Sequence, residues 1–178
     1  HYLRAGALDG LRKDQRIPAA LQAAKRSGAY SFLYASYPLV TSYLEGWARG
    51  SALDRLLEEI NGADFLDLLR DVSGCEIVKA DGQATLYAAG HHLARHDDEE
   101  AERGRQVAYV LHLTDGEWLP EWGGYLHFYD GELGIEQGMR PRFNSLHLLR
   151  VPQLHSVAEV VPGAPPARFA ITGWGRSL

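Results

Sequence analysis

From about residue 75 to its end, the chain alternates short apolar stretches with turn-forming segments, and this pattern restricts the possible folds more than any other feature. The segments between the stretches, such as YDGELG and VPGAPPA, are rich in residues that favour turns. Asp81-Gly82 predicts a hairpin between the first two strands. Many short strands separated by turns favour a small antiparallel barrel or jelly roll. The expected strands cover residues 76–80, 83–88, 106–113, 124–129, 145–151 and 167–174.

The first third of the chain shows helical patterns instead. Residues 17–27 predict one helix. A second helix is expected to begin after Ser51, a good N-cap, and to end at Gly62, because its apolar residues follow the i, i+3, i+4, i+7 spacing of an amphipathic helix. A third is expected over residues 65–72, stopped by Gly74. These helices are interpreted as scaffolding for the core.

The length of 178 residues is enough for one domain with a sizeable core and too small for two ordinary domains. We therefore expect a single domain over residues 1–178 of the α+β class. Its helical N-terminal part, residues 1–74, precedes and flanks a β-barrel or jelly-roll part, residues 75–178.

Composition excludes several classes of partner. The formal net charge is −5 and no run of Lys or Arg stands out, so the basic patch of a nucleic-acid binder is missing. No stretch approaches the roughly 18 apolar residues that a membrane span needs. The only cysteine, Cys75, excludes an internal disulfide and fits a reducing compartment. We expect a cytoplasmic protein, and the sequence does not indicate an oligomeric state.

A His-x-Asp motif at His96 and Asp98 is the first sign of chemistry. Two imidazole nitrogens and one carboxylate on one face suit ferrous iron and leave positions open for other ligands. If the motif lies on a strand, His96 and Asp98 point the same way and Asp97 points elsewhere. One such motif is weak by itself, because a chain with eight histidines contains it easily by chance.

Two later residues strengthen this interpretation. His155 follows an apolar strand directly and could complete a triad with His96 and Asp98. Arg168 begins the last strand, where alternation places it on one face with Thr172. An Arg that faces the inside of a barrel is costly unless it meets a carboxylate, which a guanidinium binds through two parallel hydrogen bonds. Thr172 can add a hydroxyl donor to the same carboxylate.

The order of these residues resembles the prolyl-hydroxylase-like group of Fe(II)/2-oxoglutarate-dependent dioxygenases over about residues 75–176. The segment Trp118 to Gly124 (WLPEWGG), with Pro141 to Asn144 (PRFN), looks especially like the branch of ribosomal-protein prolyl hydroxylases and their bacterial relatives. The matching blocks are Tyr87–Gly90, His96–Asp98, Tyr109–Leu113, Trp118–Leu126, Pro141–Asn144, Val151–Val157 and Arg168–Trp174.

The resemblance implies a double-stranded β-helix whose His96, Asp98 and His155 hold Fe(II). It also implies 2-oxoglutarate and O2 as co-substrates, succinate and CO2 as products, and ascorbate as a candidate supporting reductant. In such enzymes 2-oxoglutarate chelates the iron through its keto and C1 carboxylate oxygens, while its far carboxylate meets the barrel Arg, here Arg168. Related halogenases replace the carboxylate ligand, so Asp98 favours hydroxylation.

Further site residues follow from the same resemblance. Tyr87 matches a Tyr that binds 2-oxoglutarate in relatives, and Tyr109 lies near the position of a second one; ordinary packing inside the barrel is an equal alternative for each. Three other histidines alternate with apolar neighbours and are expected to be structural or exposed: His112, His127 and His147.

We predict hydroxylation of a protein or peptide residue, with proline as the leading candidate by family analogy. Segments 29–50 and 130–144 are the expected lids, and aromatic side chains in the first could line a peptide groove or simply cover the barrel. Two alternatives stay open: hydroxylation of a free amino acid or other small metabolite, and a non-catalytic cupin-like metal-binding protein. A serine hydrolase built on Ser156 and His155 is a poor alternative, because adjacent strand residues face opposite ways and no nucleophile-elbow glycines flank Ser156.

Overall fold

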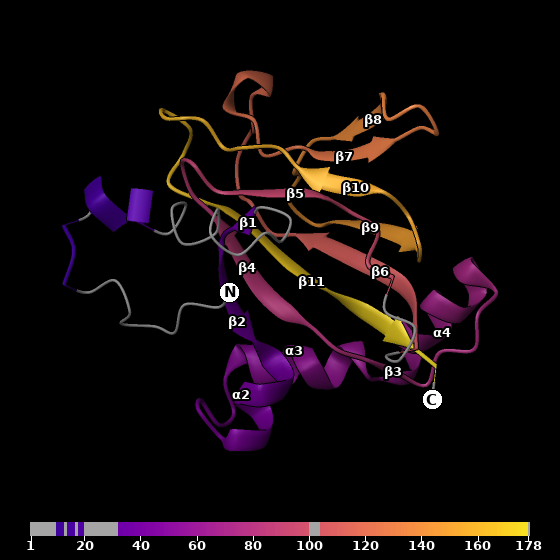
Figure 1. Cartoon of the computed structure of the whole chain (residues 1–178). Helices are drawn as coiled ribbons and strands as arrows, with labels where there is room; N and C mark the ends of the chain where they lie inside the picture. Colours follow the sequence, from indigo (N-terminus) through magenta and orange to yellow (C-terminus); the bar gives the residue numbers. More distant parts are fainter. Residues whose placement is uncertain (1–9, 13, 17, 20–31, 100–103, 178) are drawn as a thin grey trace.

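The computed structural model describes residues 10–12, 14–16, 18–19, 32–99 and 104–177. Two β-sheets face each other, and every strand pair within them is antiparallel (Figure 1). The major sheet has the order β2 (Ala35–Pro38), β4 (Gln83–Tyr87), β11 (Arg168–Arg176), β6 (Arg105–His112), β9 (Ser145–Arg150), with β3 (Lys79–Ala80) also on β11. The minor sheet has the order β1 (Phe32–Leu33), β5 (His92–His96), β10 (His155–Val157), β7 (Leu126–Tyr129), β8 (Ile135–Met139). This arrangement is consistent with the expected jelly roll.

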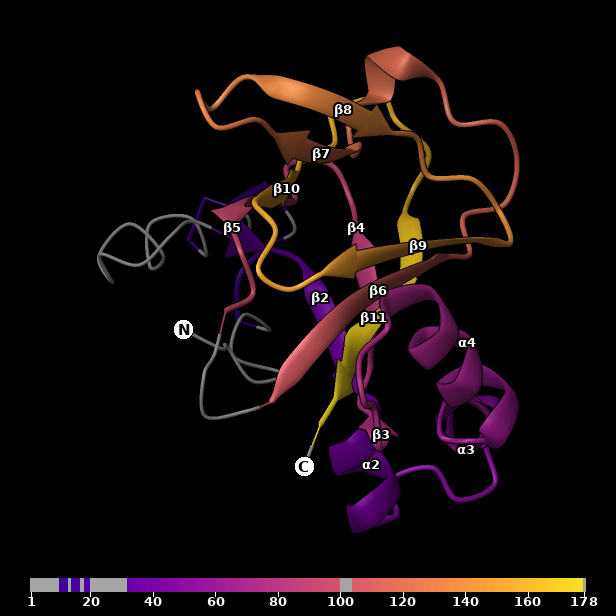
Figure 2. The same ribbon diagram turned by 90° about the vertical axis from the view of Figure 1, so that its right-hand side faces the viewer.

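Helices α3 (Ala52–Ile60) and α4 (Ala63–Ser73) cover the side of the major sheet that faces away from the minor sheet, and α2 (Leu39–Glu45) lies at the lower end of the sheet in this view, in contact with β2, β4 and α3 (Figure 2). Ser51 caps α3 as expected, because its hydroxyl accepts a hydrogen bond from the backbone N–H of Asp54 at 3.1 Å. Helix α4 ends at Gly74. Helix α3, however, ends at Ile60 with Asn61 as its C-cap, and Gly62 is the N-cap of α4.

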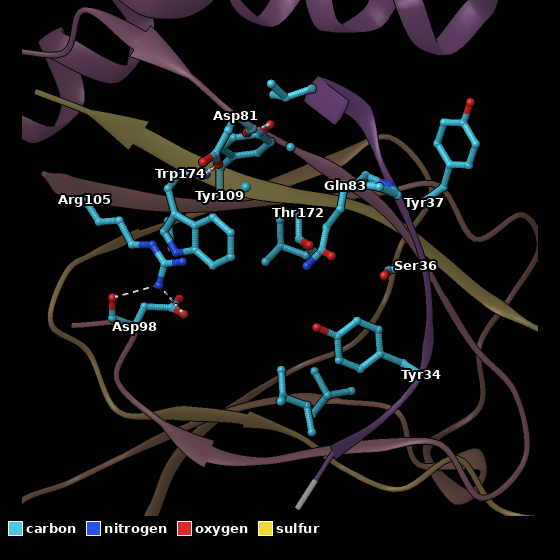
Figure 3. A pocket seen from close by; sticks show the side chains of 18 of the residues that line it. Tyr34, Ser36, Tyr37, Asp81, Gln83, Asp98, Arg105, Tyr109, Thr172 and Trp174 are labelled. Carbon is cyan, nitrogen blue, oxygen red and sulfur yellow. Dashed lines mark hydrogen bonds and ion pairs between the residues drawn. The ribbon is translucent and has the colours of Figure 1, made fainter. Parts of the chain in front are cut away.

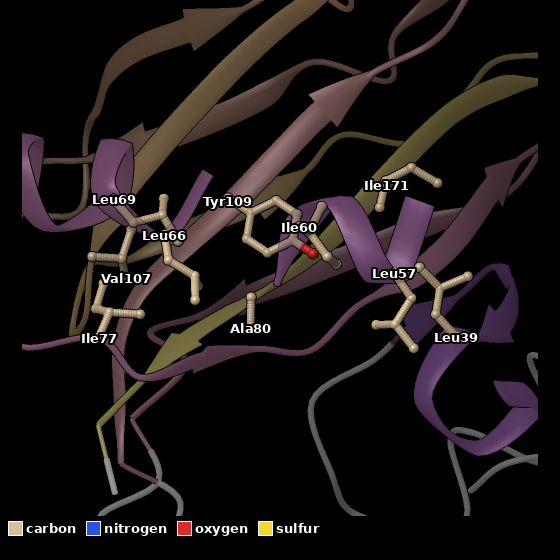
Figure 4. Packing of buried hydrophobic residues seen from close by; sticks show 10 residues of the cluster. All are labelled: Leu39, Leu57, Ile60, Leu66, Leu69, Ile77, Ala80, Val107, Tyr109 and Ile171. Carbon is tan, nitrogen blue, oxygen red and sulfur yellow. The ribbon is translucent and has the colours of Figure 1, made fainter. Parts of the chain in front are cut away.

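The apolar core has two parts, one on each face of the major sheet. The outer part joins α3 and α4 to the sheet, and its members Leu69 and Ile77 are almost fully buried (Figure 4). The inner part lies between the sheets and includes Leu126, Val157 and Ala170. Alternation along the strands decides which side chains belong to which part.

The hairpin expected at Asp81-Gly82 is wrong. Strands β3 and β4 do not pair with each other; both pair with β11, so residues 79–87 run beside one strand with an interruption at Asp81. There the Asp81 carbonyl oxygen lies 2.0 Å from where a Cβ on Gly173 would be, and the Asp81 carboxylate accepts bonds from the Trp174 N–H and from Arg176. The Asp-Gly pair is therefore a kink opposite a glycine, because Gly173 leaves room for it.

The N-terminal part is less helical than expected. Residues 32–38 form β1 and β2, and β8 lies in a segment expected to be a loop. All three are short strands at the edges of sheets, where low strand propensity suffices because one neighbouring strand supplies the pairing. The helix expected over residues 17–27 lies almost wholly outside the described residues; residues 18–19 are helical. None of the helices in the described part is both long and apolar enough to cross a membrane.

Candidate active site

His96, Asp98 and His155 converge where β5 ends and β10 begins, two neighbouring strands inside the minor sheet. His96 ends β5 and lies opposite His155, the first residue of the neighbouring strand β10. The Nε2 atoms of both imidazoles lie 3.4 Å from the Asp98 carboxylate, one from each of its oxygens. One potential ligand atom from each of the three residues lies within 4.8 Å of the others. The structure thus brings together the three residues expected from the sequence.

Asp98 reaches this position for a different reason from the one expected. Strand β5 ends at His96, so strand alternation does not orient Asp98. Its backbone instead has φ 63°, in the left-handed region that Asp tolerates better than most residues. Arg105 donates a hydrogen bond from Nη1 to the Asp98 carbonyl oxygen at 3.2 Å. Asp97 turns away, and its carboxylate accepts a bond from the N–H of Glu99.

Hydrogen bonds to the backbone orient both imidazoles. Nδ1 of His96 lies 3.0 Å from the Ala94 carbonyl oxygen, and Nδ1 of His155 lies 2.7 Å from that of Gln153. When Nδ1 carries the proton and donates it, Nε2 has an unshared electron pair directed toward Asp98. The sequence did not reveal these partners, because each is a backbone atom two residues before its histidine.

The electrostatics of the site favour a neutral His155 and an ionised Asp98. Burial, and then the neighbouring His96, lower the pKa of His155. Burial by itself raises the pKa of Asp98, but the hydrogen bond with His96 and the electrostatic interactions with His155 and His96 outweigh it, so that this pKa lies below its usual value. Two neutral nitrogens and one carboxylate oxygen are a donor set that fits Fe(II).

A cavity of about 1380 Å³ opens beside these residues, between the two sheets (Figure 3). Asp98 and His155 line this cavity together with Thr172 and Trp174 of β11. Aromatic residues of the N-terminal part also line it: Tyr34, Tyr37 and Trp47. Arg105, which the sequence did not single out, also lines it, and its guanidinium lies 3.7 Å from the centre of the Trp174 ring. Parts of the expected lid over residues 29–50 therefore border the cavity as strand β2 and helix α2.

Arg168 is the most unusual residue of this cavity. Its side chain is 1% exposed, and among the described residues its Nε and Nη2 atoms have no hydrogen-bond partner. Burial lowers the pKa of Arg168 to about 10, which still leaves it charged at neutral pH. The aliphatic part of the Arg168 side chain passes close to Gly124. A Cβ atom added to Gly124 would lie 3.2 Å from the Cδ atom of Arg168. A buried cation with two unused donors, facing a cavity, fits a carboxylate ligand.

The structure gathers only some of the other expected residues around Arg168. Tyr87 lies opposite it on β4, with its ring centre 5.0 Å from the guanidinium carbon, and stacks on Tyr34. Thr172 lies on the same inward face of β11. Tyr109 projects from the opposite face of the sheet: its ring packs edge-on against Phe65, and its hydroxyl donates to the Asp81 carbonyl oxygen at 2.7 Å. Tyr109 borders the cavity, but it lies apart from the inward-facing side chains of Arg168, Tyr87 and Thr172.

Comparison with known proteins agrees with this geometry. Residues 82–176 match the family model described as the 2OG-Fe(II) oxygenase superfamily. No curated protein matches the chain. A Pseudomonas putida prolyl-4-hydroxylase is similar in fold, with 20% identity, 91% of this chain and 84% of that chain covered, and a TM-score of 0.61.

Two other solved structures share the fold. One is the viral collagen prolyl hydroxylase from Paramecium Bursaria Chlorella virus-1 in its 2-oxoglutarate complex (16% identity, 97% and 100% covered, TM-score 0.59). The other is the Trichoplax adhaerens prolyl hydroxylase with a peptide fragment of hypoxia inducible factor (19% identity, 90% and 76% covered, TM-score 0.52).

Proposed function

Because the chain belongs to the 2OG-Fe(II) oxygenase superfamily and is therefore a 2-oxoglutarate-dependent dioxygenase, we propose that it hydroxylates a protein or peptide residue, with proline as the leading candidate. Succinate and CO2 are the co-products of this reaction. The proposal assigns residues 1–178 to one domain whose catalytic part is 75–178. The buried, unpartnered Arg168 beside the His-Asp-His cluster is the observation that carries the co-substrate assignment.

In this proposal His96, Asp98 and His155 hold Fe(II) through two nitrogens and one oxygen. Bound iron and 2-oxoglutarate supply the oxidising chemistry, which protein side chains lack. Arg168 binds the far carboxylate of 2-oxoglutarate through its Nε and Nη2 donors, and Thr172 adds a hydroxyl from the same face. Tyr87 and Tyr34 form an apolar wall that keeps water from the guanidinium. Tyr109 is left out of this group, because its hydroxyl is bonded to the backbone on the other face of the sheet.

Arg168 also distinguishes the proposal from a cupin-like metal store. A protein that only binds metal gains nothing from a buried guanidinium, which costs free energy unless an anion meets it. The carboxylate of Asp98 favours hydroxylation over halogenation, since halogenases replace that ligand with a halide.

The cavity supports a substrate larger than a metabolite. Its volume of about 1380 Å³ is well above what a five-carbon dicarboxylate needs, and the remaining wall carries Tyr37 and Trp47 as well as Tyr34. Aromatic walls suit a peptide backbone and the proline ring. Prolyl hydroxylases, one of them with a bound peptide, are also among the structures that share this fold.

Anaerobic loading with Fe(II) and 2-oxoglutarate, followed by addition of oxygen and ascorbate, tests this function. We expect succinate release to rise when proline-containing peptides are present, and peptide mass to increase by one oxygen atom. His96→Ala should abolish turnover, whereas the neighbouring Asp97→Ala should retain it. Stimulation by free proline but by no peptide would favour the small-metabolite alternative. Turnover that survives in His96→Ala would refute the metal assignment.

A further inference from the structure

A pair of histidines on the inward face of the major sheet has no role in the chemistry proposed above. His112 ends β6 and is 0% exposed. Its Nε2 atom lies 3.0 Å from Nδ1 of His147, which belongs to the neighbouring strand β9. Its other nitrogen, Nδ1, is buried and has no hydrogen-bond partner in the part of the chain that the structure describes. An unpaired polar atom in a fully buried side chain costs stability, so it calls for an explanation.

His112 lies close to Arg168. It is paired with Ala170 across the β6–β11 ladder, and Arg168 precedes Ala170 by two residues, so both side chains project from the same face. The positive charge of Arg168 is also felt by both histidines, since it lowers the pKa values of His112 and of His147 in addition to the effect of burial. Three unpartnered nitrogens, two from Arg168 and one from His112, therefore share this face.

The charge state of His112 restricts what it can do. Burial, and then the neighbouring Arg168, hold the pKa of His112 at about 3, so the ring is neutral at physiological pH. A neutral imidazole carries one proton, on Nδ1 or on Nε2. If Nε2 donates to His147, then Nδ1 is a bare acceptor. If His147 donates to Nε2, then Nδ1 of His112 carries a proton and becomes a donor.

We propose that His112 donates a hydrogen bond from Nδ1 to the far carboxylate of the dicarboxylate co-substrate that Arg168 anchors, and that His147 fixes the required tautomer by donating to Nε2. His112 is then a binding residue, and His147 is a positioning residue. A carboxylate accepts more bonds than one guanidinium edge supplies, so a third donor beside Arg168 has an acceptor to meet. Binding this anion satisfies all three unpartnered nitrogens. The inference rests on the proposed function, because that function supplies the dicarboxylate.

Equilibrium binding to the Mn(II)-loaded protein, which does not turn over, tests this role. Two probes differ only at the far end: 2-oxoglutarate carries the carboxylate, and 2-oxopentanoate has a methyl group in its place. His112→Phe should weaken 2-oxoglutarate binding by about 10- to 100-fold, the range expected for a charge-assisted hydrogen bond. The same substitution should change 2-oxopentanoate binding by less than about twofold. His127→Phe, which removes a histidine from the minor sheet, is the matched control and should leave both affinities unchanged.

Two further measurements separate a binding role from a structural one. His112→Asn should recover most of the lost 2-oxoglutarate affinity, because its amide can donate from a position near that of Nδ1. His147→Phe should give a smaller loss than His112→Phe, since it removes only the control of the tautomer. In the nitrogen NMR spectrum of the unmodified protein with 2-oxoglutarate bound, the proton of His112 should be on Nδ1.

Several results would overturn the inference. If His112→Phe weakens both probes equally or neither of them, the pair is only structural. A proton on Nε2 of His112 in the complex would exclude the donor role directly. If the unmodified protein binds 2-oxoglutarate but His112→Phe binds it equally well, the inference fails and the proposed function stands. If the unmodified protein binds neither probe, both fail.

Discussion

Arg168→Met gives a prediction in which stability and function change in opposite directions. The guanidinium is buried without a carboxylate partner among the described residues, and burial lowers the pKa of Arg168 well below the usual value of a guanidinium, to about 10. Since one pKa unit corresponds to about 1.36 kcal/mol, the folded protein disfavours the charged form by roughly 3 kcal/mol. The sign follows from linkage, because the unfolded chain holds the guanidinium proton of Arg168 more tightly than the folded protein does. The cost to the free energy of unfolding is therefore fully present at neutral pH and disappears only as pH rises above the folded-state pKa of about 10.

Methionine is of similar length and has no charge to bury. We therefore expect Arg168→Met to raise the free energy of unfolding of the ligand-free protein by about 2 kcal/mol, after allowing for imperfect packing. The same substitution should abolish the stabilisation that 2-oxoglutarate gives the native protein, because the far carboxylate loses its cation. Urea unfolding, followed by tryptophan fluorescence with and without 2-oxoglutarate, measures both effects in one experiment.

Arg176→Met is the matched control. Arg176 forms an ion pair with Asp81, so its removal leaves a carboxylate without its partner. This variant should be less stable than the native protein by about 1–3 kcal/mol and should respond normally to 2-oxoglutarate. If Arg168→Met were instead less stable than the native protein by more than about 1 kcal/mol, the interpretation of Arg168 as an uncompensated buried charge would be refuted.

Three further outcomes are expected. Asp98→Asn should weaken Mn(II) binding by at least about 100-fold while Asp97→Asn does not, as measured by electron paramagnetic resonance; equal losses would contradict the assignment. Gly173→Ala should cost about 3 kcal/mol in urea unfolding, because its Cβ would lie 2.0 Å from the Asp81 carbonyl oxygen, and a neutral result would show that the kink can move. Because burial lowers the pKa of His155, the ring of His155 should stay neutral as pH falls through the ordinary value of 6.5, as followed by the NMR shifts of its ring in the metal-free protein; a midpoint at or above 6.5 would show that burial does not control this pKa.

The sequence predicted that β11 is a strand, and it also predicted which side chains of β11 face the inside of the barrel. Arg168, Ala170 and Thr172 lie on the inward face because side chains alternate in any strand. The helix start at Ser51 and the helix end at Gly74 were predictable for a similar reason: capping depends on residues next to each other in the chain.

Features that depend on distant parts of the chain were not predictable. Asp81-Gly82 has the composition of a hairpin, but its conformation is decided by Gly173, which lies far along the chain and has no side chain to obstruct the kink. The contact between His112 and His147 spans 35 residues and exists only because β6 and β9 are neighbours. Each histidine alone looks like an ordinary strand residue.

The position of Arg168 explains how the fold can tolerate an expensive charge. Strand β11 pairs with β4 from Arg168 onward and with β6 from Ala170 onward, so a movement that brought Arg168 to the solvent would break this pairing. The ligand-free protein therefore retains the free-energy cost of burying the charged guanidinium of Arg168. A dicarboxylate that removes this penalty gains affinity that a monocarboxylate lacking the far group cannot gain. In the proposed function, the same buried charge that lowers the stability of the ligand-free fold thus selects the co-substrate by the group farthest from the metal.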